Sequence, residues 1–146
     1  MIQRIQSVFL LLASAATFGL FGLSFAKSDQ VIADSQLFSD QQFNLMDDTV
    51  LMVLFCLAGA IAFLAIFLFK NRVLQRNITL LSIVVSLAAM GWSVFQFTQD
   101  AASKATGAVE FNFGLGLPVL AIIFAAIAAR FIKKDDKLVR SMDRLR

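Results

Sequence analysis

The sequence has few of the residue types that soluble proteins and enzymes commonly use. It contains no histidine, no tyrosine, one proline, one cysteine and one tryptophan in 146 residues. A single cysteine excludes an intrachain disulfide framework, and the lack of histidine removes the commonest metal ligand and general base. Charged residues make up 16% of the chain, against about 25% in typical soluble domains. These shortages point away from a soluble enzyme.

Hydrophobic residues are abundant and fall in long runs. They make up 59% of the chain, and the mean hydropathy is +0.79. About 20 helical residues cross the roughly 30 Å hydrocarbon core of a bilayer. A soluble bundle would show a polar face with a helical period, which the runs lack. We therefore predict an all-α membrane protein, a single domain (1–146) formed by an antiparallel bundle of four transmembrane helices. The predicted spans are about 5–25, 49–69, 78–97 and 115–132, followed by a basic cytoplasmic tail at 133–146.

The basic residues are distributed unevenly between the two sides of this bundle. Of the 13 Lys and Arg, only Lys27 and Lys104 fall in the first and third connectors. Basic residues concentrate on the cytoplasmic side of membrane proteins, so both termini are predicted to be cytoplasmic. The net charge of +3 is then explained by topology, and no nucleic-acid partner is expected. The candidate contacts with anionic lipids are Lys70, Arg72, Arg76, Arg130, Lys133, Lys134, Lys137 and Arg140.

The end of the first span offers an alternative interpretation. Ser24-Phe25-Ala26 has the small-x-small spacing of a signal-peptidase site. However, the apolar run before it is longer than the usual 7–15 residues of a signal peptide, and Arg4 is the only preceding charge,. This pattern favours a membrane span.

The chain contains no recognisable catalytic, cofactor or metal site. Cys56 lies among apolar residues and is expected to be an inert thiol,. The Gly114-x-Gly116 pair is too short for a nucleotide-binding loop and predicts a turn,. The four spans contain no Asp, Glu, Lys or Arg before Arg130 near the end of the fourth, whereas transport pathways usually do,. Ser82, Ser86, Ser93 and Gln96 give the third span modest polarity, which fits either hydrogen bonds between helices or a groove for a polar ligand,.

Small residues recur at intervals of four in every span. Such stripes let helices approach closely in lipid, inside one bundle or between subunits. The stripes are Ala15 and Gly19, Ala58 and Ala62, Ser82 and Ser86, and Ala121, Ala125 and Ala129.

The segment before the fourth span has the period of a strand. Residues 109–117 alternate large apolar residues with polar residues or glycine, and Pro118 suits the first turn of a helix,. A lone strand is unstable, so we predict an extracytoplasmic β cap that pairs this segment with 27–48. The alternative is a helix that continues outward with a kink at Pro118. The candidate apolar contacts in 27–48 are Val31, Ile32, Leu37, Phe38 and Phe43.

The basic tail has apolar residues at helical spacing, namely Phe131, Leu138, Met142 and Leu145. An amphipathic basic helix after a span is suited to lying on an anionic leaflet. The alternative is a solvated helix end that serves only as a topology signal.

Three segments carry a resemblance to a known family. These are MIQRIQS at 1–7, KNRVLQ at 70–75 and RFIKKDDKLVRSMDRLR at 130–146. Together with the rest of the chain they resemble an uncharacterised family, a domain of unknown function, of small four-helix bacterial inner-membrane proteins. The resemblance implies the four-span topology and a Gram-negative inner membrane, and it implies no activity, ligand or catalytic residue.

The leading functional hypothesis is a non-enzymatic accessory or scaffold subunit. Its expected partners are membrane lipids and another membrane or extracytoplasmic protein, and no cofactor is expected. The alternative is a small carrier or lipid-handling protein with a groove between helices. A membrane-embedded enzyme is the third and least supported class.

Overall fold

The four predicted spans form a closed bundle of antiparallel helices. The computed structural model describes residues 2–28, 41–104 and 109–143. Within these ranges the long helices are α1 (Ile2–Phe18), α2 (Thr49–Phe67), α3 (Arg72–Lys104) and α4 (Gly116–Asp143). Contacts join α1 to α2, α2 to α3, α3 to α4 and α4 back to α1. All four are long and apolar enough to cross a membrane. The predicted fold class is confirmed.

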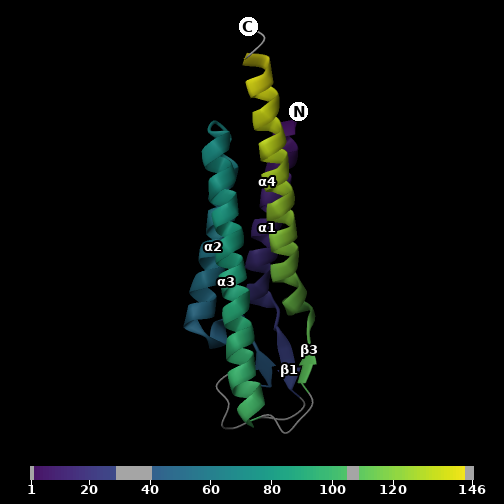
Figure 1. Ribbon diagram of the computed structural model, residues 1–146. Coiled ribbons are helices and arrows are strands. Elements are labelled where there is room, and N and C mark those ends of the chain that lie inside the picture. The colour runs from purple at the N-terminus through teal and green to yellow at the C-terminus, as the bar shows by residue number, and fades with distance from the viewer. Residues whose placement is uncertain (1, 29–40, 105–108, 144–146) are drawn as a thin grey trace.

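The bundle has two distinct ends (Figure 1). The two termini and the turn between α2 and α3 lie at one end, which we call the termini end. A small sheet lies at the opposite end, which we call the cap end. The sheet comprises β1 (Ala26–Ser28), β2 (Gln42–Phe43) and β3 (Val109–Phe111).

The helices differ in length from the predicted spans. α1 ends at Phe18 and continues as the 3-10 turn η1 (Gly19–Gly22), since two glycines weaken the helix and the chain must turn into β1,. α3 extends beyond 78–97 in both directions. α4 runs on through much of the predicted tail, because the Lys, Arg and Asp residues after the apolar stretch permit continued helical hydrogen bonding,.

The small-residue stripes of α2, α3 and α4 face the interior of the bundle. Their residues, Ala58, Ala62, Ser82, Ser86, Ala121, Ala125 and Ala129, are all buried. Ser82 Oγ donates a hydrogen bond to the carbonyl oxygen of Ala58 at 3.0 Å and so links α3 to α2. Ser86 returns its hydrogen bond to Ser82 of its own helix. α1 differs, because Ala15 and Gly19 are exposed and Ala13 is the buried alanine.

The predicted strand before the fourth span is present and is shorter than the alternating pattern. Only Val109–Phe111 forms β3, and a 3-10 turn, η3 (Phe113–Leu115), leads directly into α4. The alternative of one continuous helix through Pro118 is wrong. The strand order is β2-β1-β3 with antiparallel pairing, and Ala26 lies opposite both Phe43 and Phe111. Phe43 is buried as expected, whereas Val31, Ile32, Leu37 and Phe38 lie outside the described residues.

Two apolar clusters hold the bundle together. The cluster at the cap end joins the sheet to the helices and comprises Leu20, Phe25, Ala26, Phe43, Leu45, Leu51, Phe55 and Ala89. The cluster towards the termini end comprises Leu10, Ala65 and Ala128, with Phe9, Ile66 and Ile78 against it. Between them the outward faces of the helices remain apolar and exposed, for example at Leu81 and Val84, as expected of a surface that faces lipid.

Candidate functional site

The cap is fastened to the helix ends by an unusually close backbone contact. A Cβ atom on Gly114 would lie 2.3 Å from the carbonyl oxygen of Ser24, so only glycine fits this position,. Beside it, Asn112 Nδ2 donates to Ser24 Oγ at 2.8 Å, and the Asn112 amide donates to the Phe25 carbonyl at 2.9 Å. Gly114 therefore lies in a turn, as predicted, and that turn fixes β3 and the start of α4 against the residues before β1.

A second connection at the cap end is centred on Asp48, the N-cap residue of α2. Its carboxylate accepts hydrogen bonds from the amides of Val50 and Leu51. It also accepts from Trp92 Nε1 at 2.8 Å and from Gln96 Nε2 at 2.7 Å, both on α3. One carboxylate thus caps α2 and holds α3 beside it.

The hydrogen bonds to Asp48 favour its charged form. Partial burial raises the pKa of this carboxyl, but the bonds from Trp92, Gln96 and the two backbone amides outweigh that effect, so the pKa lies below its ordinary value,. This site was not predicted from the sequence. An Asp directly before an apolar helix is a helix N-cap signature and was the available signal.

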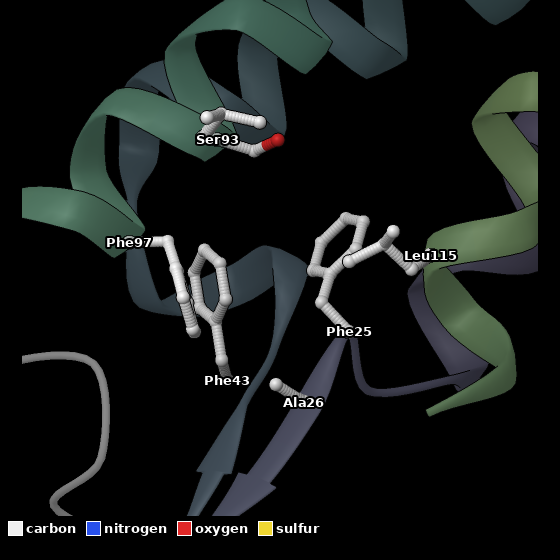
Figure 2. A pocket seen from close by; sticks show the side chains of 7 residues that line it. Phe25, Ala26, Phe43, Ser93, Phe97 and Leu115 are labelled. Atoms are coloured by element: carbon white, nitrogen blue, oxygen red, sulfur yellow. The ribbon is translucent and has the colours of Figure 1, made fainter. Parts of the chain in front are cut away.

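An apolar cavity of about 240 Å³ lies between α3 and the sheet. In Figure 2, Phe97 and Phe43 stand on one side of it, Phe25 and Leu115 on the other, and Ser93 above. The ring centroids of Phe25 and Phe43 are 5.3 Å apart. Ser93 Oγ donates a hydrogen bond to the Met90 carbonyl of its own helix. An engineered apolar cavity of roughly 150 Å³ can bind benzene. This lining therefore suits a hydrocarbon group and does not form the polar groove considered for Ser93 and Gln96.

At the termini end, an ion pair connects α3 to α4. Arg72 Nε lies 2.8 Å from Asp135 Oδ2, and both side chains are largely buried. Gln75, one turn further along α3, donates from Nε2 to the Ala65 carbonyl of α2 at 3.0 Å. These polar contacts lie beside the predicted lipid-binding residues.

The candidate lipid-binding residues whose side chains are described lie around the termini end, but not all of these side chains are available to lipid. Arg72 is engaged by Asp135. The side chain of Arg140 lies outside the described part of the chain, although its backbone belongs to α4. The exposed members are Lys70, Arg76, Arg130, Lys133, Lys134 and Lys137.

The described residues offer no metal centre, since no three His, Cys, Asp or Glu side chains gather there. Cys56 is exposed on the outward face of α2, in an apolar groove with Phe21 and Met52. A lone thiol in such surroundings behaves as a small apolar residue.

Comparison with known proteins identifies a family. The model of a family described as a domain of unknown function, DUF4293, matches residues 2–145. No curated protein and no solved structure gives a significant match. The match covers nearly the whole chain, including the helices, the cap and the segments that carry the resemblance.

Proposed function

This chain belongs to the DUF4293 family of unknown function, and we propose that it is a non-enzymatic integral membrane protein that acts as an accessory or scaffold subunit. The resemblance described above favours a bacterial inner-membrane location, and the distribution of Lys and Arg supports cytoplasmic termini,. In that orientation the cap end is extracytoplasmic. Membrane lipids surround the bundle, and the cap contacts another membrane or extracytoplasmic protein.

The rigid cap is the observation that carries this proposal. Four spans can be joined by simple loops, yet this chain uses Gly114, Asn112 and Ser24 to fix a sheet to the helix ends. The fixed cap presents two large apolar side chains, since Phe113 is 89% exposed and Met46 is 65% exposed. Exposed aromatic residues on a rigid support are typical anchors of protein interfaces.

Photo-crosslinking in cells tests this proposal. A photoreactive amino acid at position 113 is expected to give a discrete protein adduct, while the same amino acid at position 84, in the middle of α3, gives lipid adducts only. Val84 is a matched control because it is also an exposed apolar residue, at 61%. Lipid adducts alone at both positions would contradict a protein partner at the cap.

The apolar cavity favours a second candidate function, a small carrier or lipid-handling protein. The cavity lies beside Ser93 and Phe97, near the end of the apolar stretch of α3, where an acyl chain of the adjacent leaflet can reach it. Native mass spectrometry after gentle detergent extraction is expected to detect a retained lipid if this function is correct. Ser93→Trp, which fills the cavity, should then abolish retention, whereas Leu81→Trp on the exposed face should not. Retention that is equal in both variants would contradict this function.

A further inference from the structure

Four buried polar atoms at the termini end lack a hydrogen-bond partner among the described residues. Two are donors, Gln6 Nε2 and Arg72 Nε, and two are acceptors, Gln75 Oε1 and Asp135 Oδ2. Arg72 and Asp135 attract each other as ions at 2.8 Å, but their alignment does not make a hydrogen bond. Gln6 and Gln75 are only 2% and 1% exposed. Leaving a buried amide group without a hydrogen-bond partner destabilises the folded state, so these side chains require an explanation.

Helix geometry places these side chains together. The apolar layer below them consists of Leu10, Ala65, Ile78 and Ala128, one residue from each helix. Gln6 precedes the α1 member of this layer by four residues, and Gln75 precedes the α3 member by three. Asp135 follows the α4 member by seven residues, which is two turns,. Since residues at these spacings share a helix face, all three side chains lie above the layer, towards the termini end.

We propose that Gln6, Arg72, Gln75 and Asp135 bind water inside the bundle. Buried waters typically make about 2–4 hydrogen bonds to polar groups that otherwise lack partners, and a water both donates and accepts. A water molecule can therefore accept a hydrogen bond from Gln6 Nε2 and donate one to Gln75 Oε1. An ion that only donates or only accepts hydrogen bonds cannot do both.

The same residues indicate where water enters the bundle and how far it reaches. The side chains of Arg72 and Asp135 are 24% and 12% exposed, so water enters beside the ion pair from the termini end. The apolar layer stops it, since Leu10 and Ala128 are fully buried and offer no polar side chain. The result is a hydrated inlet that ends within the bundle. This assignment is independent of the partner proposed for the cap.

Radiolytic hydroxyl-radical footprinting of the full-length protein in lipid nanodiscs tests the inlet. X-rays generate radicals from bound water, and the radicals oxidise only the side chains beside it. Leu10 and Ile132 are expected to be oxidised although they are 0% exposed. Leu51, also 0% exposed but in the cluster at the cap end, is the matched control and should remain unmodified. Equal oxidation of Leu10, Ile132 and Leu51 would overturn the proposal.

A double variant locates the water. Gln6→Leu combined with Gln75→Leu removes the unpaired donor and acceptor together, so oxidation of Leu10 should fall to the level of Leu51. Undiminished oxidation of Leu10 in the folded double variant would show that these amides do not hold the water. The wild-type comparison remains decisive if the double variant does not fold. A direct bond between the two amides would leave Leu10 unmodified in the wild type and would also overturn the proposal.

Discussion

At the scale of single residues, Gly114 has the closest backbone neighbour of the glycines in the described part of the chain. Gly114→Ala places a methyl group 2.3 Å from the Ser24 carbonyl oxygen. This oxygen belongs to the backbone, so it cannot rotate away from the methyl group. We expect a loss of about 1–3 kcal/mol or more in the free energy of unfolding, as for other overpacked sites. Denaturant unfolding in detergent micelles measures this loss. Gly116→Ala is the control, because its added methyl group meets nothing within 4 Å.

Asp48 gives a prediction about acid stability. Its folded pKa lies below the ordinary value of 3.8, so the ionised carboxylate contributes stability that is fully present above that value,. The contribution is lost as the pH falls through the lower, folded pKa. Unfolding titrations between neutral pH and about pH 2 should show an acid-induced loss that is smaller in Asp48→Asn, which retains an N-cap side chain.

The chain provides its own spectroscopic probe of that titration. Trp92 is the only tryptophan, and its indole nitrogen donates to Asp48. Its fluorescence should therefore change as Asp48 is protonated, and this change should be absent in Asp48→Asn. Identical pH profiles for the two proteins would contradict the assigned role of Asp48.

At the scale of elements, α4 combines a span and a basic extension in one helix. Its exposed Lys133, Lys134 and Lys137 are spaced along the segment after the apolar stretch. A basic residue near an anionic surface contributes roughly 1 kcal/mol. A 130–146 peptide should therefore bind anionic vesicles at least about a hundredfold more tightly than neutral vesicles, and replacing the three lysines by serine should remove most of this preference. Equal binding to both vesicle types would favour the alternative of a topology signal alone.

The tail differs from the predicted amphipathic surface helix because one of its polar residues points inward. Asp135 is buried against Arg72, and Ile132 is fully buried, so this face of α4 packs on the bundle. The spacing of Phe131 and Leu138 indicated an apolar face but gave no sign of this ion pair. An acidic residue among many basic ones has no period of its own, and its partner lies on another helix.

At the scale of the whole molecule, apolar run length and charge placement were sufficient to predict the four helices and their antiparallel order. The strand at β3 was also predictable, because alternation and a proline mark a break in helical periodicity. The hydrogen bonds of Asp48 with Trp92 and Gln96 were not predictable, because they join residues 44 and 48 positions apart in the sequence. The predicted pairing of β3 with 27–48 is confirmed at Lys27 and Ser28 of β1, which lie opposite Glu110 and Val109, and only Ala26 of β1 falls outside the predicted segment.

The orientation of the whole bundle provides the last prediction. Eleven of the 13 basic residues fall in the N-terminal segment, the second connector and the C-terminal segment of the sequence, and such an excess is retained on the cytoplasmic side during insertion,. Reporter fusions after Arg146 and within 71–76 should therefore be active only as cytoplasmic reporters. A fusion within 30–45 should be active only as an extracytoplasmic reporter. A cytoplasmic signal from 30–45 would contradict the orientation and would place the cap, with Phe113 and its apolar cavity, on the side where no extracytoplasmic partner can reach it.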